Sequence, residues 1–333
     1  MKYTLSDFDY HLPEELIAQS PASPRDHARL LVYDRSTKTI KDDFFYNLGK
    51  YLSKQTRLVV NNSKVEKCRL MFDGGKKELF VTSVRNNNTV EALVRPGKRF
   101  RVGKTVQLTD MVTAEVTHVA DDGLRTITLS HDLDAPELEA FKYTPFPPYI
   151  EQDESLASEY QTVYAKDLGS KAAPTAGLHF TDELLDKLKE QGISKSEVTL
   201  HVGLGTFAPV KTEKLDEHTM HNEWYQLDAN TADELSNSAH ITAVGTTSVR
   251  VLESLASSDR QFNPQSGETD IFITPGYKFK AVDALITNFH LPKSTLLMLV
   301  SALMGFNEMH RVYEHAIKEK YRFYSFGDAM LII

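Results

Sequence analysis

Cysteine is almost absent from this chain of 333 residues, which contains Cys68 alone. A single cysteine cannot form a disulfide within the chain, and few cysteines are typical of proteins from a reducing compartment. A cytoplasmic location is therefore expected. Cysteine–histidine clusters of the kind that bind zinc and an H-E-x-x-H motif are also missing, so the sequence predicts no metal site.

Long hydrophobic runs are missing as well. The most apolar stretch, residues 295–305, is much shorter than the roughly 20 residues that a membrane-spanning helix needs. It predicts a buried helix, and no membrane partner is expected. The N-terminal residues "MKYTLSDFDYHLPEEL" lack the apolar segment of a signal peptide.

Positive charge is not in excess either, because the net charge is −8. This argues against a general nucleic-acid-binding protein, which usually has a basic surface. Residues 64–131 differ from the rest, with 12 Lys and Arg against 8 Asp and Glu. A basic segment therefore lies inside an acidic protein.

The same central region differs in secondary structure. Residues 63–147 contain six short strand-like runs separated by the turn sequences "GGK", "NNN", "PGK" and "DDG", which predicts a small β-barrel inserted into the chain. Residues 1–62 and 148–333 alternate apolar strands with amphipathic helices. They predict one larger, discontinuous α/β domain.

Several elements of the larger domain can be predicted from its sequence. Residues 157–167 and 181–192 are predicted helices, the second with Thr181 as N-cap and Gly192 just beyond its end. In residues 246–256, Arg250 and Glu253 are spaced to form an ion pair on one helix. The final residues, 321–333, predict two strands joined by a turn.

Four segments combine small and polar residues next to predicted strands or helices. They are "AAPTAGLHF" (172–180), "LHVGLGTF" (200–207), "VGTTSVR" (244–250) and "TNFHLPKS" (287–294). Loops at strand ends carry the ligands of α/β proteins, so together they predict a single pocket. "VGLGTFA" also fits the dinucleotide fingerprint, but the residues after it do not form the helix that this fingerprint requires.

Two other patterns are open to more than one interpretation. Residues 94–104 contain five cations and no acid, namely Arg95, Lys98, Arg99, Arg101 and Lys104. They form either a solvated hairpin or a contact for phosphates. His218, His221 and Glu223 could share a metal, but three or four ligands with a second shell are needed, so hydrogen bonding is the preferred interpretation.

These motifs, in this order, resemble the S-adenosylmethionine:tRNA ribosyltransferase-isomerase family of queuosine synthesis. The resemblance extends over nearly the whole chain and includes "PFPPYI", "YQTVYA", "HTMHNEWYQL" and "YRFYSFGDAM" in addition to the four segments above. It implies a larger barrel-like α/β domain interrupted by a small β-barrel. It also implies transfer and isomerisation of the ribosyl group of S-adenosylmethionine onto 7-aminomethyl-7-deazaguanine at the tRNA wobble position. The products would be epoxyqueuosine-tRNA, adenine and methionine.

The resemblance assigns roles to residues on the matched motifs. The reaction needs a base next to the sulfonium, and the candidate acid–base groups are His179, His201, His221, Glu223, His290 and Asp328. The pocket itself would be formed by Thr175, Gly177, Gly203, Gly205, Thr206, Gly245, Thr246, Thr247 and Asn288. Arg250 or Lys293 could hold the methionine carboxylate. S-adenosylmethionine is a substrate, no separate cofactor is implied, and a monomer is expected.

Residues 61–70 depart from the family pattern, with Lys64 in place of an arginine. Lys and Arg are not equivalent in a bidentate contact. Two alternatives therefore stay open. One is a paralogue that uses another acceptor or is inactive, and the other is a non-catalytic tRNA-binding protein centred on the inserted domain.

Overall fold

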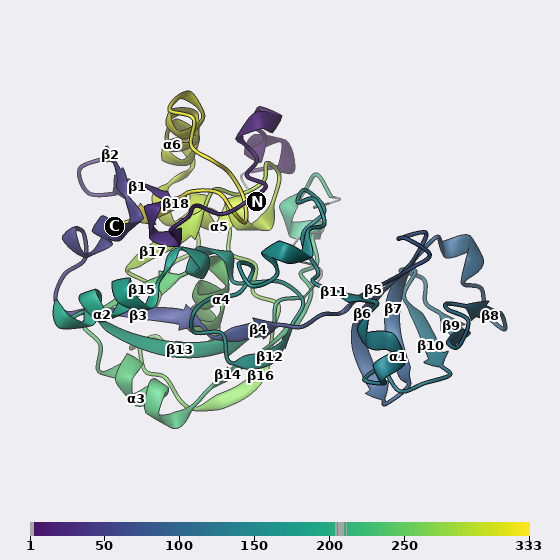
Figure 1. Cartoon of the computed structure of the whole chain (residues 1–333). Coiled ribbons are helices and arrows are strands. Elements are labelled where there is room, and N and C mark those ends of the chain that lie inside the picture. Colours follow the sequence, from purple (N-terminus) through teal and green to yellow (C-terminus); the bar gives the residue numbers. More distant parts are fainter. Residues whose placement is uncertain (1–2, 204, 206–209, 211) are drawn as a thin grey trace. The chain divides into compact units, whose positions relative to one another are not determined.

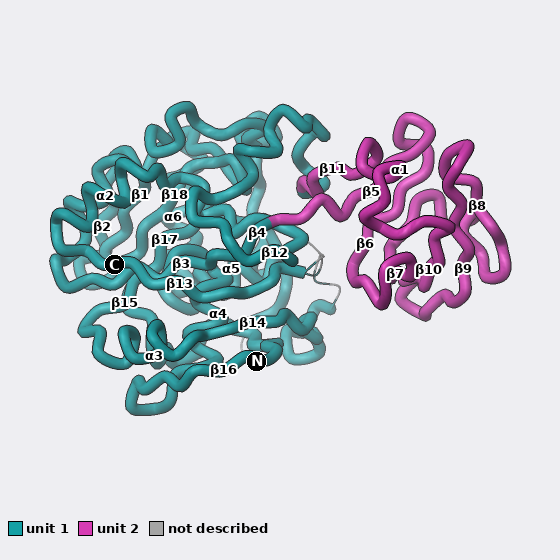
Figure 2. The backbone as a smooth tube through the Cα atoms, turned by 60° about the horizontal axis from the view of Figure 1, so that its bottom comes forward, with its two compact units in different colours: residues 1–64, 147–333 teal, residues 65–146 magenta. Residues whose placement is uncertain are grey.

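The computed structural model describes residues 3–203, 205, 210 and 212–333. The chain forms two compact units (Figure 2). Unit 1 comprises residues 1–64 and 147–333, and unit 2 comprises residues 65–146. The borders predicted from sequence, after residues 62 and 147, lie within two residues of these.

Unit 1 is built on a large mixed sheet of nine strands in the part of the chain that the structure describes (Figure 1). In sheet order the strands are β16 (Gln265–Thr269), β14 (Glu223–Leu227), β13 (Ser194–Leu200), β3 (Thr56–Asn61), β15 (His240–Val244), β17 (Ala284–Asn288), β18 (Ala329–Ile332), β1 (Arg29–Asp34) and β2 (Thr39–Phe44). The central strands β13, β3, β15 and β17 are mutually parallel. Their carboxyl ends therefore meet at one edge of the sheet.

Hydrophobic side chains cover both faces of this sheet, because successive residues of a strand point to opposite sides. On β3, Val59 belongs to one core, whereas Leu58 and Val60 belong to the other. The first core contains residues of α3 (Ala229–Ser236), α4 (Thr246–Leu255), α5 (Thr295–Met304) and α6 (Phe306–Lys318). The second contains residues of α2 (Asp182–Glu190) and η4 (Phe45–Lys50).

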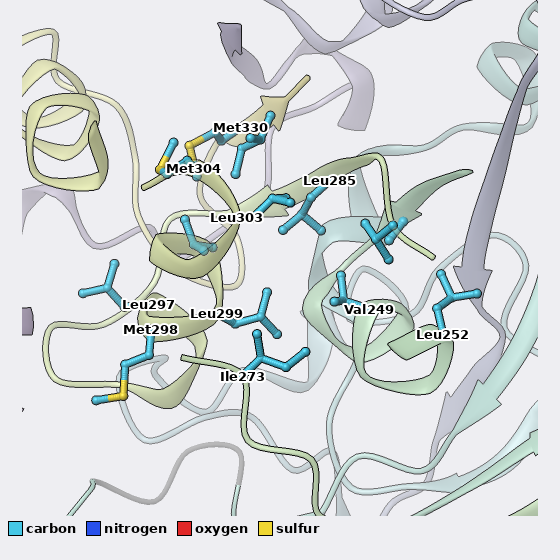
Figure 3. Close-up of a cluster of buried hydrophobic side chains, with 14 of the residues drawn as sticks. Val249, Leu252, Ile273, Leu285, Leu297, Met298, Leu299, Leu303, Met304 and Met330 are labelled. Carbon is cyan, nitrogen blue, oxygen red and sulfur yellow. The ribbon is translucent and has the colours of Figure 1, made fainter. Parts of the chain in front are cut away.

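Figure 3 shows how the first core fixes α4 and α5. Val249 of α4 and Leu299 of α5 lie near Leu285 of β17, and Leu252 and Leu297 belong to the same apolar core. Each side chain is at most 2 % exposed, and full burial of such a side chain contributes about 1.5–3 kcal/mol. The N-terminal ends of both helices are consequently held rigidly against the sheet.

The predicted helix over residues 181–192 is confirmed with both of its caps. The hydroxyl of Thr181 accepts the N–H of Leu184 at 3.1 Å. Gly192 follows the C-cap at φ +85°, a conformation that glycine adopts without strain. Leu184 and Leu188, four residues apart, bury the apolar face of α2.

Three local predictions are wrong. Residues 157–167 form turns and the start of a strand rather than a helix, because Thr162 is buried like Tyr160 and Tyr164 but would lie on the opposite face of a helix. Only the second of the two predicted C-terminal strands exists, as β18, since residues 321–328 fold as a bend. Arg250 and Glu253 do not pair, because each has a buried partner on another segment.

Short single-turn helices and one small sheet complete unit 1. The 3-10 turns are η1 (Leu5–Phe8), η2 (Glu14–Leu16), η3 (Arg25–His27), η6 (Glu154–Leu156), η7 (Thr175–His179) and η9 (Leu215–Glu217). Strands β4 (Ser63–Val65) and β12 (Asp167–Ser170) pair with one another.

Unit 2 is an antiparallel sheet of seven strands, and all of its residues are described. In sheet order the strands are β11 (Lys142–Tyr143), β5 (Arg69–Phe72), β6 (Lys77–Asn86), β7 (Thr89–Arg95), β10 (Arg125–Leu129), β9 (Thr113–Val119) and β8 (Thr105–Gln107). Two short helices, η5 (Gly97–Arg99) and α1 (Pro136–Glu139), complete the unit.

The six strands predicted for this unit are present, and β11 is an additional seventh strand. Its two residues are too few to give a sequence signal. Because β11 and β8 are the two ends of the strand order, the sheet is an open curl rather than a closed barrel. Cys68 lies in its core, where burial raises the pKa of the thiol to about 12, so the side chain behaves as a small hydrophobe.

Candidate active site

A hollow of about 660 Å³, counted with its open mouth, lies at the edge of the sheet where the parallel strands β15 and β17 end. We call it the main hollow. Its lining residues are Tyr149, Ala173, Pro174, Thr175, Ala176, Val202, Gly245, Thr246, Thr247, Thr287, Asn288, Phe289, His290, Leu291, Ser294, Leu296, Tyr324 and Ser325. They come from all four of the segments that the sequence singled out. In open α/β sheets, the carboxyl ends of the strands are where ligands bind.

Asn288, the last residue of β17, organises the inner wall of the main hollow. Its side-chain oxygen accepts the hydroxyl of Thr175 at 2.9 Å, and its side-chain nitrogen donates to Nε2 of His179 at 3.1 Å. His179 is 5 % exposed and does not line the hollow itself. Burial first, and then the charges of Arg322 and Arg25, lower the pKa of His179 to about 3. A neutral His179 therefore fixes the orientation of Asn288.

His290 lies two residues after the end of β17 and does line the main hollow. Its Nε2 lies 2.8 Å from the hydroxyl of Thr287, and its backbone N–H donates to the hydroxyl of Tyr313 at 3.0 Å. The backbone carbonyl accepts the hydroxyl of Tyr10. Burial lowers the pKa of His290 to about 3, so the ring offers one donor and one acceptor at neutral pH.

Two tyrosines form an aromatic wall, and neither is among the site residues predicted from the sequence. The ring centroids of Tyr149 and Tyr324 lie 4.8 Å apart, and the hydroxyls of Tyr149 and Ser325 are 2.9 Å apart. Tyr324 has φ +71°, so the bend places Tyr324 and Ser325 on the same hollow. Both tyrosines stand in the quoted motifs "PFPPYI" and "YRFYSFGDAM", which was the available signal. The strand predicted over residues 321–326 would have placed Tyr324 and Ser325 on opposite faces, so the two residues were not expected to line one hollow.

The bend that carries Tyr324 depends on a glycine and a buried carboxylate. A Cβ on Gly327 would lie 2.5 Å from the carbonyl oxygen of Arg322, so only glycine fits. The carboxylate of Asp328, 2 % exposed, accepts the backbone N–H groups of Arg29 at 3.0 Å and Arg322 at 2.8 Å. Asp328, a predicted acid–base group, therefore holds the bend together and does not line the main hollow.

A smaller hollow of about 310 Å³ shares Leu296 with the first. Its lining residues are Gly205, His218, Met220, His221, Glu223, Arg250, Thr295 and Leu296. The carboxylate of Glu223 and the guanidinium of Arg250 form a buried ion pair there. Glu223 also accepts the N–H of Gly203 at 3.0 Å, and Arg250 donates to the carbonyl of Thr269 at 3.4 Å.

The remaining predicted site residues lie elsewhere. Gly177 makes room for the hydroxyl of Tyr164, which would lie 2.0 Å from an added Cβ. His201 packs on Trp224 with ring centroids 4.8 Å apart, and burial lowers its pKa. Lys293 is exposed and pairs with Asp9 at 2.6 Å. Thr206 is outside the described residues.

The five predicted tRNA-binding cations lie together on unit 2. Arg95 ends β7, Lys98 and Arg99 belong to η5, and Arg101 and Lys104 precede β8; all five are exposed. The unit as a whole is not basic, because residues 65–146 contain 12 Lys and Arg and 12 Asp and Glu. Positive charge is thus concentrated in residues 95–104, which connect β7 to β8. These two strands are not neighbours in the sheet, so the segment is a connecting loop and not a hairpin. The guanidinium of Arg125 donates to the carbonyl of Phe100 in this segment at 3.0 Å.

Neither a cluster of metal ligands nor a membrane-spanning helix occurs in the described part of the chain. Within residues 3–203, 205, 210 and 212–333, no three His, Cys, Asp or Glu side chains gather in a way that could hold a metal ion. None of the helices in these ranges is long and apolar enough to span a membrane.

The fold and the hollow define a two-unit α/β protein with a hollow at the carboxyl edge of its larger sheet. The family model described as "Queuosine biosynthesis protein" matches residues 5–332. The chain belongs to this family, that of the S-adenosylmethionine:tRNA ribosyltransferase-isomerases, and it is an enzyme of this class. The predicted family is thereby confirmed.

Individual relatives support the same assignment. The S-adenosylmethionine:tRNA ribosyltransferase-isomerase of Caldanaerobacter subterraneus is 48% identical over 98% of this chain and 99% of its own length. That of Carboxydothermus hydrogenoformans is 49% identical over 99% of each. A crystal structure of S-adenosylmethionine tRNA ribosyltransferase from Thermotoga maritima, 37% identical, covers 98% of this chain and 100% of its own with a TM-score of 0.56. This similarity confirms the predicted α/β fold with an inserted β domain, whose sheet is an open half-barrel.

Proposed function

We propose that the main hollow binds S-adenosylmethionine and that the enzyme transfers and isomerises its ribosyl group. The acceptor is 7-aminomethyl-7-deazaguanine at the wobble position of tRNA, and the products are epoxyqueuosine-tRNA, adenine and methionine. A tRNA substrate points to the cytoplasm as the place of action. The expected monomer stays a prediction.

One observation carries this proposal: the bends after β15 and β17 and the Thr175 segment converge on one cavity with an aromatic wall. Tyr149 and Tyr324 offer ring faces to a nucleobase or to the sulfonium cation. Asn288 and Thr175 provide hydrogen-bonding groups in the same hollow. A pocket that is mostly apolar with a few fixed polar groups is typical of small-molecule sites.

The predicted acid–base residues contribute in different ways under this proposal. His290 lines the main hollow and is positioned to contact the substrate. His179 positions Asn288. His221 and Glu223 belong to the adjoining smaller hollow. We keep His290 as the candidate for proton transfer, and we assign Asp328 to the support of the Tyr324 bend.

The altered segment at residues 61–70 gives no reason to propose a different acceptor. None of these residues is among those that line the main hollow. Lys64 is exposed on β4, whereas Asn61 is buried and donates to the carbonyl of Leu200 at 2.9 Å. This segment therefore contributes a hydrogen bond between β3 and β13.

Release of adenine tests the proposal. The chain is incubated with S-adenosylmethionine and tRNA bearing the 7-aminomethyl base, and free adenine and modified tRNA are measured. We expect stoichiometric adenine release with this tRNA and none with tRNA that has unmodified guanine. Tight tRNA binding without turnover would favour the non-catalytic alternative. Turnover with the free base alone would favour the paralogue.

A further inference from the structure

The start of α4 lines the main hollow and lacks a side-chain cap. Its N-cap is Gly245, at φ +86°, and no side-chain hydrogen bond caps the helix. The first N–H groups of an α-helix have no acceptor inside the helix, and together with the helix dipole they attract anions. Gly245, Thr246 and Thr247 all line the hollow.

A second observation independently marks the same place as a binding site. The hydroxyl of Thr247 is buried, with the residue 8 % exposed, and it has no hydrogen-bond partner among the described residues. A Cβ on Gly245 would lie 3.4 Å from this oxygen and 3.7 Å from Cβ of Ala176, so the hydroxyl sits over the Gly245 bend. A buried hydroxyl without a partner is costly, unless a ligand supplies one.

We propose that the N-terminus of α4, with the Thr247 hydroxyl, binds the carboxylate of the methionyl part of S-adenosylmethionine. This inference rests on the proposed function. A terminal carboxylate can enter a cavity, whereas a tRNA phosphodiester needs room for the chain on both sides. The aromatic wall of Tyr149 and Tyr324 belongs to the same hollow, so it can face the sulfonium while the carboxylate meets the helix.

The two cations suggested by the sequence for this carboxylate are already engaged. Arg250 is paired with buried Glu223 and donates to the carbonyl of Thr269. Lys293 pairs with Asp9 and is absent from the residues that line the main hollow. None of the residues that line the main hollow is Lys or Arg. The helix terminus is therefore the positive group that the hollow offers to an anion.

The packing of α4 makes this site rigid before ligand binding. Val249 and Leu252 anchor the helix in the first core (Figure 3), and the hydroxyl of Ser248 donates to the carbonyl of Val244 at 2.8 Å. A preorganised site loses little conformational entropy on binding. Removing one hydrogen bond to the carboxylate should consequently appear directly in the affinity.

The experiment compares two ligands on matched variants by calorimetric titration. The ligands are S-adenosylmethionine and its decarboxylated analogue, which keeps the nucleoside, the sulfonium and the amine. Thr247→Val removes the hydroxyl, and Thr247→Ser keeps it. Thr242→Val is the matched control, because Thr242 is fully buried on β15 with an equally unpartnered hydroxyl and does not line the hollow.

We expect Thr247→Val to weaken S-adenosylmethionine about tenfold or more and to leave the decarboxylated analogue within about twofold. Thr247→Ser and Thr242→Val should resemble the parent for both ligands. Equal losses for the two ligands, or no loss, would overturn the carboxylate assignment. So would weaker tRNA binding with unchanged S-adenosylmethionine affinity, which would place a phosphate there.

The parent enzyme separates failure of this inference from failure of the proposed function. If the parent binds both ligands equally while still releasing adenine in the presence of modified tRNA, the carboxylate assignment fails and the function stands. If the parent binds neither ligand and releases no adenine, the proposed function fails and the inference fails with it.

Discussion

The side-chain nitrogen of Asn288 lies 3.1 Å from Nε2 of His179, while its oxygen accepts the hydroxyl of Thr175 at 2.9 Å. The three side chains form one chain of hydrogen bonds from the second core to the main hollow. Because His179 is neutral, its Nε2 is the acceptor and the orientation of the Asn288 amide is determined. This arrangement makes His179 a positioning residue that acts through Asn288.

His179→Ala should lower kcat/KM for S-adenosylmethionine by about 10- to 100-fold, since one buried amide donor loses its partner at a cost of roughly 1–3 kcal/mol. His179→Gln supplies an amide oxygen in place of Nε2 and should restore much of the loss. Steady-state kinetics measure both. Full activity of the alanine variant, or no rescue by glutamine, would contradict the positioning role.

The aromatic wall gives a prediction for ligand binding. Tyr324→Leu keeps much of the apolar volume but removes the ring face, and it should weaken S-adenosylmethionine by about 1–2 kcal/mol, roughly 5- to 30-fold. Tyr149→Phe removes the hydroxyl contact with Ser325 and should weaken the binding of S-adenosylmethionine by less than about 1.5 kcal/mol. Calorimetric titration measures both values.

A control for these variants is available on another part of unit 1. Tyr46 stacks on exposed Phe44 with ring centroids 5.5 Å apart and does not line the hollow. Tyr46→Leu should leave the affinity for S-adenosylmethionine unchanged. Equal effects of the Tyr46 and Tyr324 substitutions would show that the Tyr149–Tyr324 wall does not contact the ligand.

Stability should fall with decreasing pH because of two histidines. In the unfolded chain an imidazole binds a proton near pH 6.5, but burial holds the folded pKa of both His179 and His290 at about 3. Below pH 6.5 the unfolded state therefore takes up protons that the folded state does not. Each ring should lower the free energy of unfolding by about 2 kcal/mol between pH 7 and pH 5.

Urea denaturation of the parent and of His179→Gln at pH 7 and pH 5 checks this linkage. The variant cannot protonate at position 179, so its pH-dependent loss should be smaller than that of the parent by about 2 kcal/mol. His118→Gln, at an exposed position of unit 2, should leave the pH dependence as it is in the parent. An identical slope for all three proteins would refute the assignment.

The basic segment of residues 95–104 gives a prediction for tRNA binding. Changing Arg95, Lys98 and Arg101 together to Ala should weaken tRNA binding about equally for different tRNAs, and the salt slope should fall by roughly one unit for each phosphate that the variant no longer neutralises. Binding of S-adenosylmethionine should not change. Lys50, Lys54 and Lys189, exposed cations of unit 1, are the matched control triple. Equal salt slopes for the two triple variants would show that the basic segment is exposed to solvent and does not contact tRNA.

Sequence patterns predicted the parts of the structure that local rules determine. The cap of α2 by Thr181, the apolar core of α5 and the β-rich insert follow from side-chain chemistry within a few residues. The convergence of four small-and-polar segments on one hollow was also predicted, because strand ends of an α/β sheet meet at one edge. It holds for Thr175, Gly245, Thr247, Asn288 and His290.

Long-range partners decided the rest. Arg250 is three residues from Glu253 along α4, yet it pairs with Glu223 on a strand 27 residues away. Tyr324 faces the hollow only because of its positive φ and because Gly327 and Asp328 close the bend. Residues 157–167 have a helical pattern, but their tyrosines are buried in the core. No local rule contains these long-range interactions.

The position of β18 has a consequence for how the enzyme is made. This strand lies between β17 and β1 in the sheet, and Leu30 is paired with Ala329. A ribosome therefore has to deliver residues 329–332 before the hairpin of β1 and β2 can join the other strands. Until then, β1 lacks its partner β18. Its residues Leu30, Leu31 and Val32, which are buried in the folded protein, remain without these contacts. Such long sequence separation slows folding. Because the N-terminal hairpin exposes apolar residues during this time, we expect chaperones to bind the nascent chain.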